Sequence, residues 1–256
     1  MVGKIKTEID GHVLTITIDD PATLNAISIA DSYTLETIWN DFEQNPDLWI
    51  AIVTGAGEKA FCSGHDMADN FADPLPKSGW LGLAARERPL TKPIIAAING
   101  LTYGGGFELA LYCDIIVVDE RAVFAMSEPR VGFAAAGGGV DQLALIVPRP
   151  VAMGMLLTGR KIDAAEAARW GLATEVVPAG TSLAAARRWA DQILKCAPLA
   201  VRYTKELAYQ SIQDHDWHRN IVAKRAHVVE RLLVMEDAEE GKTAFAQKRP
   251  PVWVGR

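Results

Sequence analysis

Short apolar runs, separated by polar turns, dominate the first half of the chain. Residues 4–19 alternate apolar and polar side chains around Asp10-Gly11, a favoured hairpin turn, and predict two paired strands. Residues 28–44 repeat apolar side chains at helical spacing and predict a helix beginning at Ser28. Four further apolar runs do not alternate: 49–57, 92–100, 114–119 and 122–126. Such strands, separated by helices, predict an α/β fold whose sheet is covered on both faces.

The second half of the chain turns to helical periodicity from about residue 139. Residues 165–178 predict a helix that stops at Gly171, followed by a short strand. Three more stretches have helical spacing: 198–212, 216–236 and 236–247. We therefore expect two regions, an α/β core over residues 1–197 and a helical C-terminal region over residues 198–256.

Composition and charge narrow the class of protein. The 256 residues are 49% hydrophobic and 23% charged, with a formal net charge of −6 and no cluster of basic residues, so we expect no nucleic-acid partner. The apolar runs are too short to cross a bilayer, so we expect no membrane segment. The three cysteines, at 62, 113 and 196, are far apart and in no CxxC pair. This spacing favours a reducing compartment, and we expect a cytoplasmic protein.

Three consecutive glycines, Gly104 to Gly106, stand directly before an apolar stretch that contains Glu108. A dinucleotide fingerprint would need glycine where Leu109 stands, and a phosphate-binding loop would need Gly-Lys-Ser/Thr, so neither motif is present. A tight connection from strand to helix remains one interpretation. The other is an oxyanion hole, in which backbone N–H groups at a helix start hold a developing negative charge. A second turn would then be needed, and 61–67, with Gly64, is the candidate for a further strand, turn and helix start.

Two glutamates could act on a ligand held by those glycines. Glu108 lies in the first turn after them, and Glu128 ends a predicted strand before Pro129. Burial would raise the pKa of both carboxyls, and their mutual repulsion would separate the two pKa values, so that one acts as acid and the other as base. The helix start favours an ionised Glu108. By spacing alone, however, two such acids are more often surface or ion-pair residues.

A series of motifs, in order along the chain, favours the functional interpretation of the two glutamates. They are "NAIS" (25–28), "IVTGAGEKAFCSGHDM" (52–67), "KPIIAAINGLTYGGGFELALYCDI" (92–115), "SEPRVGF…GGG" (127–139), "LLTGRKIDAAEAARWGLATEVVP" (156–178) and "AFAQKRPPVW" (244–253). With them the chain resembles the enoyl-CoA hydratase/isomerase (crotonase) family. This resemblance implies the ClpP/crotonase fold, a spiral of ββα units, with a helical C-terminal trimerisation region. It also implies a homotrimer, which in this family often pairs into a hexamer.

The resemblance also implies the roles of individual residues. The oxyanion donors would be the backbone N–H groups of His65 and Gly105; many members carry alanine in place of His65, which leaves a backbone donor intact. Glu108 and Glu128 match the two catalytic glutamates of the hydratases. Together they would hold a water and add it across a double bond conjugated to a thioester, with Glu128 as the expected proton donor to Cα.

Coenzyme A would enter as part of an acyl-CoA thioester substrate, with no permanently bound cofactor and no metal. The resemblance places it on Asn25, Ala26, Ile27, Ser63, His65, Asp66, Met67, Ala68, Gly104, Gly105, Phe245 and Lys248. The acid and histidine cluster formed by Asp214, His215, Asp216, His218 and His227 lacks the convergence that a metal site needs.

The motifs identify the family more specifically than they identify the reaction that this chain would catalyse. Two glutamates favour an enoyl-CoA hydratase, a hydro-lyase, because a double-bond isomerase typically manages with a single acid/base. A CoA-ester binder or RNA-associated homologue without turnover would be expected to have lost an acid or to carry a basic surface. Ala135 replaces a proline that the family often has beside the active site, so the acyl pocket could differ from that of other members.

One branch of the family is a narrower alternative. "GGGFELALYCDIIV" and the tail from residue 236 look closest to the carnitinyl-CoA dehydratase branch, which hydrates crotonobetainyl-CoA. Its substrate carries a trimethylammonium group, which favours aromatic or acidic partners. The predicted long loop over residues 66–88 could supply such partners from Asp69, Phe71, Asp73 and Trp80.

Overall fold

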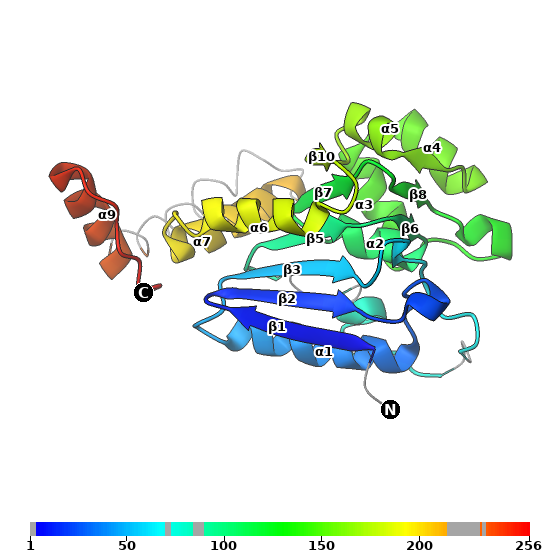
Figure 1. Ribbon diagram of the computed structural model, residues 1–256, viewed down its shortest axis with the longest axis horizontal. Helices are drawn as coiled ribbons and strands as arrows, with labels where there is room; N and C mark the ends of the chain where they lie inside the picture. Colours follow the sequence, from blue (N-terminus) through cyan, green and yellow to red (C-terminus); the bar gives the residue numbers. More distant parts are fainter. Residues whose placement is uncertain (1–3, 70–72, 84–89, 214–230, 232–233) are drawn as a thin grey trace.

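The computed structural model describes residues 4–69, 73–83, 90–213, 231 and 234–256. Its larger sheet has six strands in the order β1-β2-β3-β5-β7-β10 (Figure 1). Their bounds are β1 Ile5–Asp10, β2 Val13–Ile18, β3 Ile50–Gly55, β5 Ile94–Ile98, β7 Ile115–Asp119 and β10 Glu175–Val177. All neighbours are parallel except β1 and β2. The predicted hairpin is confirmed, although Asp10 pairs with Val13, so that Gly11 and His12 form the turn.

A second sheet of four short strands lies beside the first, in the order β4-β6-β8-β9. Its strands are β4 Ala60–Cys62, β6 Leu101–Tyr103, β8 Val123–Ala125 and β9 Ile162–Asp163. The chain passes three times from a strand of the larger sheet into this one: β3 to β4, β5 to β6 and β7 to β8. After β6 it enters helix α2, Gly105–Leu111, which completes a ββα unit. The predicted spiral of such units is confirmed.

The larger sheet is covered on both faces, as the unalternating apolar strands predicted. One face packs on α1, Ile29–Gln44, through residues that include Leu35 and Trp39. The other face packs on α6, Ser182–Ile193, through Ala185 and Ala190. In Figure 1 the two helices lie on opposite sides of the strands. The central strands β3 and β5 are buried along their whole length, whereas the edge strand β1 is mostly exposed and carries polar side chains.

The start of α1 is determined locally. Ser28 and Asp31 form a capping box, in which each side chain accepts a hydrogen bond from the backbone N–H of the other residue. The predicted start at Ser28 is therefore confirmed. The helices after residue 139 are α3 Gly139–Ile146, α4 Arg149–Thr158, α5 Ala164–Arg169, α6, α7 Pro198–Gln213 and α9 Glu236–Gln247. Most of the predicted helix over 216–236 lies outside the described residues.

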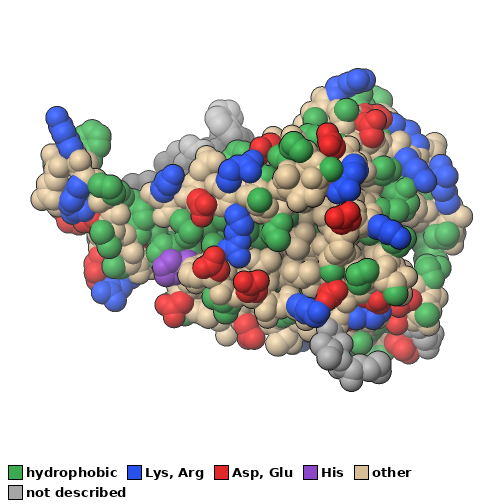
Figure 2. All heavy atoms as spheres, viewed as in Figure 1, with side chains coloured by type: hydrophobic (Ala, Val, Ile, Leu, Met, Phe, Trp, Pro, Cys, Tyr) green, Lys and Arg blue, Asp and Glu red, His purple; other side chains and the backbone are tan. Residues whose placement is uncertain are grey.

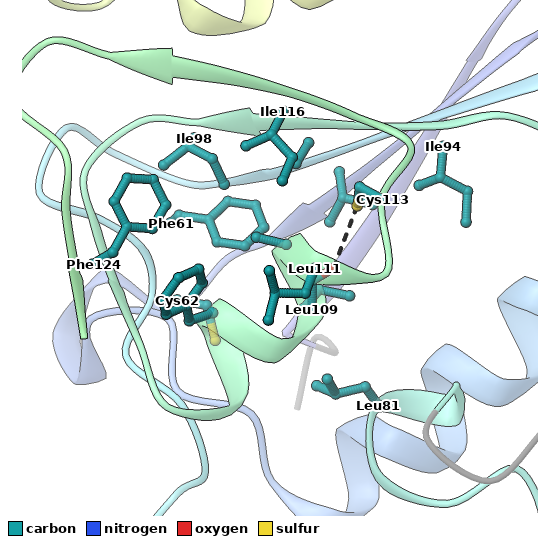
Figure 3. Packing of buried hydrophobic residues seen from close by; sticks show 14 of the residues in the cluster. Phe61, Cys62, Leu81, Ile94, Ile98, Leu109, Leu111, Cys113, Ile116 and Phe124 are labelled. Carbon is teal, nitrogen blue, oxygen red and sulfur yellow. Dashed lines mark hydrogen bonds between the residues drawn. The ribbon is translucent and has the colours of Figure 1, made fainter. Parts of the chain in front are cut away.

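Every residue of helix α2 is buried. Figure 3 shows Leu109 and Leu111 of this helix pointing into an apolar cluster with Phe61, Phe124 and the strand residues Ile94, Ile98 and Ile116. The Cys113 thiol caps the same helix by donating to the Leu109 carbonyl over 3.4 Å. This packing fixes the N-terminal end of α2, where the glycines stand.

Helix α9 stands apart from the two sheets in Figure 1. The tail after it returns toward α6, and the Trp253 indole N–H donates to the Lys195 carbonyl over 2.9 Å. On the face shown in Figure 2, acidic and basic side chains are interspersed. Within the described part of the chain, no helix is both long enough and apolar enough to cross a bilayer.

Candidate active site

The glycine cluster forms the turn between β6 and α2. Gly104 has φ +50°, which side-chain-bearing residues rarely adopt, and its carbonyl accepts hydrogen bonds from Phe107 and Glu108. Gly105 is the first residue of α2, so its N–H has no acceptor within the helix. Gly106 packs against the end of β4, where an added Cβ would lie 2.7 Å from Cys62 Cβ. Only a residue without a side chain permits this approach.

The second turn follows β4 and leads to His65. Its predicted helix start is wrong: His65 instead forms an isolated parallel bridge with Ile27. The Ile27 N–H donates to Gly64 O, and the Asp66 N–H donates to Ile27 O, each over 2.9 Å. These bonds hold the segment extended, which excludes a helix. A Cβ on Gly64 would lie 3.2 Å from Gly105 N, so the two turns lie directly against each other.

Both glutamates line one cavity of about 490 Å³, together with both turns. Glu108 is buried, and its Oε1 accepts a hydrogen bond of 2.9 Å from Gly139 N–H. Glu128 begins a short 3₁₀ helix, η3, Glu128–Val131, and its Oε1 lies 3.3 Å from where a Gly104 Cβ would be. Its Oε2 is buried and has no hydrogen-bond partner among the described residues. A buried carboxylate oxygen in this state fits a polar ligand atom or water.

Burial raises the pKa of Glu108 to about 7, and the charge of Glu128 adds to the rise. Hydrogen bonds from Gly139 and Gly137 oppose it without cancelling it. Burial also raises the pKa of Glu128. The prediction that the helix start keeps Glu108 ionised is therefore wrong, because loss of hydration outweighs the field of a seven-residue helix. At neutral pH, Glu108 can hold or release a proton.

The raised pKa of Glu108 has a consequence for stability. Folding disfavours the ionised form, so this carboxyl destabilises the protein increasingly as the pH rises from 4.5 toward about 7. We expect Glu108→Gln to stabilise the fold by about 3 kcal/mol at pH 8 and by little at pH 4.5, at roughly 1.4 kcal/mol per pKa unit. Urea unfolding of both proteins at the two pH values measures the difference. An equal gain at both would show that the carboxyl is not desolvated.

The His65 side chain forms part of the cavity wall. Its ring stacks on Trp80 with centroids 4.1 Å apart, and its Nε2 lies 3.1 Å from Asp69 Oδ2. Asp69 in turn accepts a 2.7 Å hydrogen bond from Ile29 N–H at the start of α1. Burial lowers the pKa of His65, although Asp69 opposes this. The ring is thus held in place by its contacts with the Trp80 indole and the Asp69 carboxylate.

Several predicted coenzyme A contacts lie at this cavity: Ser63, His65, Met67, Gly104 and Gly105 line it. Asp66 and Ala68 lie beside them in the same turn, where the Asp66 carboxylate accepts from Ala68 N–H. Ala26 and Ile27 are buried next to His65. The Asn25 side chain donates to the carbonyls of Ala56 and Ala60, so it positions the loop instead of facing the cavity.

Other predicted contacts do not reach the cavity within one chain. Phe245 is 88% exposed on α9, and Lys248 directly follows that helix. Neither lines the cavity. Of the candidates for a cationic substrate, Trp80 lines the cavity, Asp69 contacts His65, and Asp73 is exposed and does not line the cavity. Phe71 lies outside the described residues.

The glycines at 137–139 were not recognised as functional from the sequence. A Cβ on Gly137 would lie 2.5 Å from Glu108 Oε2, and the Gly137 carbonyl accepts a 3.0 Å hydrogen bond from Tyr112 OH. Gly139 supplies the N–H that binds Glu108. This second glycine triplet therefore shapes the pocket of the carboxylate. The signal in the sequence is that these three consecutive glycines repeat the pattern of Gly104 to Gly106.

Metal and thiol chemistry find no support in the described part of the chain. It contains no group of three or more histidine, cysteine, aspartate or glutamate residues that could hold a metal ion. The histidine cluster from 215 to 227 lies outside the described residues. Burial raises the pKa of the Cys62 thiol to about 12 and raises that of Cys113 as well, so neither is a ready nucleophile.

Comparison with known proteins identifies the family of this chain. The family model described as "Enoyl-CoA hydratase/isomerase" matches residues 8–256. A carnitinyl-CoA dehydratase of Proteus mirabilis is 41% identical over 254 residues, which cover 96% of each chain. A carnitinyl-CoA dehydratase of Escherichia coli O157:H7 is 39% identical over 255 residues, covering 96% of this chain and 97% of the relative.

Solved structures agree with this result. The enoyl-CoA hydratase of Mycobacterium tuberculosis superimposes with a TM-score of 0.91 at 34% identity, covering 99% of each chain. A probable enoyl-CoA hydratase/isomerase from Mycobacterium abscessus has a TM-score of 0.91 at 37% identity, covering all of both chains. The chain therefore belongs to the enoyl-CoA hydratase/isomerase family and has the crotonase fold.

Proposed function

We propose that this protein catalyses the reversible addition of water across the 2,3 double bond of an enoyl-CoA thioester. The observation that carries the proposal is the cavity that brings together the buried carboxyl of Glu108, the half-buried carboxyl of Glu128, both of raised pKa, and two facing backbone turns. Carboxyls that share a site in this way can divide the tasks of acid and base. An isomerase would need only one of them.

The thioester oxygen would accept hydrogen bonds from the backbone N–H groups of His65 and Gly105. As water attacks Cβ, the electron pair of the double bond moves toward this oxygen, and the two donors stabilise the enolate. The ionised carboxyl takes a proton from the attacking water. The protonated carboxyl delivers a proton to Cα and restores the thioester. Because burial raises the pKa of Glu108 to about 7, we assign this role to Glu108 in place of the expected Glu128. The pair of carboxyls gains one proton and loses one in each turnover, and the gained proton passes back to the first donor before the next turnover.

Glu108 and Glu128 are suited to this exchange because neither forms an ion pair with a basic residue of the described chain. An ion pair would hold one carboxyl permanently charged. Instead, Glu108 binds a neutral N–H and Glu128 keeps an oxygen without a partner. The unpartnered Oε2 of Glu128 supplies a position for the reacting water.

We further propose that coenzyme A is held by the segments Asn25–Ile27 and Ser63–Ala68, as part of a substrate that arrives and leaves with each turnover. The reaction requires no metal and no bound cofactor, because the carboxyls and amides supply acid, base and electrostatic stabilisation. We place the enzyme in the cytoplasm, where acyl-CoA thioesters would be its small-molecule partners.

A homotrimer, or a pair of trimers, would bring Phe245 and Lys248 to the coenzyme of a neighbouring subunit. Phe245 is 88% exposed, and other large apolar side chains of the C-terminal region and of α3 and α4 are also exposed: Val234, Val252, Leu145 and Leu157. Exposed apolar surface of this kind favours association between subunits. Light scattering after gel filtration should give the mass of three or six chains of 27.8 kDa; a monomer would contradict this arrangement.

Hydration of crotonobetainyl-CoA, or the reverse dehydration of carnitinyl-CoA, is a second candidate. The relatives named carnitinyl-CoA dehydratase, at 39–41% identity over nearly the whole chain, favour it. The two carboxyls and Trp80 in the cavity are groups that attract a quaternary ammonium ion. This candidate uses the same hydro-lyase chemistry at a different acyl group.

Absorbance of the conjugated thioester distinguishes these possibilities. The protein is incubated with crotonyl-CoA, longer 2-enoyl-CoA esters and crotonobetainyl-CoA, and we expect the absorbance to fall as water adds. A 3-enoyl-CoA ester serves as the control for isomerisation, which raises the same absorbance. Isomerisation without hydration of any 2-enoyl ester would overturn the proposal.

A further inference from the structure

We infer that Trp80 limits the size of the acyl group, so that the enzyme favours short-chain 2-enoyl thioesters over long ones. This inference rests on the proposed function, because it assumes that the thioester carbonyl lies at the two turns. Trp80 belongs to a short 3₁₀ helix, η2, Trp80–Gly82, and its ring lines the cavity.

The Trp80 indole lies beside both Gly105 and Gly137, which line the cavity. A Cβ on Gly105 would lie 2.5 Å from Trp80 Nε1, and a Cβ on Gly137 would lie 2.9 Å from Trp80 Cδ1. Gly105 marks the carbonyl position, whereas Gly137 borders the Glu108 carboxylate. Nε1 and Cδ1 are bonded to each other, so one edge of the indole borders both the carbonyl side of the site at Gly105 and the Glu108 side at Gly137. An acyl chain that continues past Glu108 on this side meets the ring.

The ring is held firmly from one face. It stacks on His65 with an angle of 20° between the ring planes, and only 8% of Trp80 is exposed. His65 is itself bound by Asp69. To turn away from the cavity, the indole would have to break this stack, and the aromatic contact favours its present position.

The backbone that carries Trp80 is anchored to α1. The next residue, Leu81, donates through its N–H to Ser32 Oγ over 3.3 Å, and its carbonyl accepts from the buried Trp39 indole over 3.1 Å. Gly82 lies so close to α1 that an added Cβ would be 2.5 Å from Glu36 N. Leu81 also adopts φ +63°, an uncommon conformation that these contacts maintain. The indole is thus a fixed wall.

The cavity has a second apolar side, formed by Val131, Phe133 and Ala134. Phe133 is 48% exposed and belongs to the loop between η3 and α3. If acyl chains left the site along this loop, Trp80 would not affect their length. Phe133 therefore provides the matched control for Trp80.

The test compares wild type with Trp80→Ala, Trp80→Phe and Phe133→Ala on four-carbon and ten-carbon 2-enoyl-CoA. We expect Trp80→Ala to raise the ten-carbon to four-carbon ratio of kcat/KM at least about tenfold, and Trp80→Phe to raise it less. Phe133→Ala should leave the ratio within about twofold. An unchanged ratio in a folded Trp80→Ala protein, or a ratio that shifts in Phe133→Ala instead, would overturn the inference.

Calorimetric binding of butyryl-CoA and decanoyl-CoA, which cannot be hydrated, separates this inference from the proposed function. The decanoyl to butyryl affinity ratio should rise in Trp80→Ala alongside the kinetic ratio, whether or not wild type turns over. Absence of turnover would overturn the proposed function alone, whereas an unchanged affinity ratio would overturn the role of Trp80. Trp80→Phe, which retains an aromatic ring against His65, provides both readouts if the alanine variant does not fold.

Discussion

Glu108→Gln and Glu128→Gln should each slow hydration of 2-enoyl-CoA at least about a hundredfold, the loss expected when a positioned acid or base is removed. Glutamine is nearly isosteric with glutamate but cannot exchange a proton. Binding of a saturated acyl-CoA should persist, because the amides of His65 and Gly105 and the coenzyme contacts are unchanged. Steady-state kinetics and calorimetry measure the two effects separately.

The two glutamates should also act as a unit. The double variant should be little slower than the slower single variant, because each turnover requires both proton transfers and the loss of either one already blocks it. Asp141→Asn is a suitable control, since this exposed acid lies close by, in the first turn of α3, but does not line the cavity. A single glutamine variant with full rate would show that the two-carboxyl mechanism is wrong.

Gly106→Ala should have an effect of similar size without removing any functional group. The new methyl would meet Cys62 at the end of β4, at 2.7 Å from its Cβ and still closer to its carbonyl oxygen. Helix α2 would have to move away from the segment that leads to His65, so the two amide donors would no longer converge. We expect about a hundredfold to a thousandfold loss of kcat, as when one oxyanion donor is lost.

Gly154→Ala is the control for this substitution. Gly154 lies within α4, where an added Cβ meets only Arg160 Nε at 3.7 Å. Alanine favours a helix interior by up to about 1 kcal/mol over glycine, so this variant should be as stable as wild type or more stable, and fully active. Circular dichroism melting verifies that Gly106→Ala is folded. A folded Gly106→Ala enzyme with the wild-type rate would contradict the role of the two turns.

The ionisation of the two glutamates could be predicted from the sequence only in part. That two carboxyls would share a cavity followed from the resemblance, because Glu108 and Glu128 are twenty residues apart and nothing in their spacing brings them together. Which carboxyl is harder to ionise depends on how much water each has lost. Burial of Glu108 beneath the loop of Gly137 decides this, and the local rule for helix starts gave the opposite answer.

The sequence by itself determined the elements and the family. The hairpin at the N-terminus, the capped start of α1 and the sheet buried on both faces depend on neighbouring residues and on periodicity, which are local properties. The extended backbone at His65, the glycine loop over Glu108 and the position of Trp80 were decided by the tertiary structure alone. Each depends on contacts between segments far apart in the chain, and such contacts leave no periodic signal in the residues that make them.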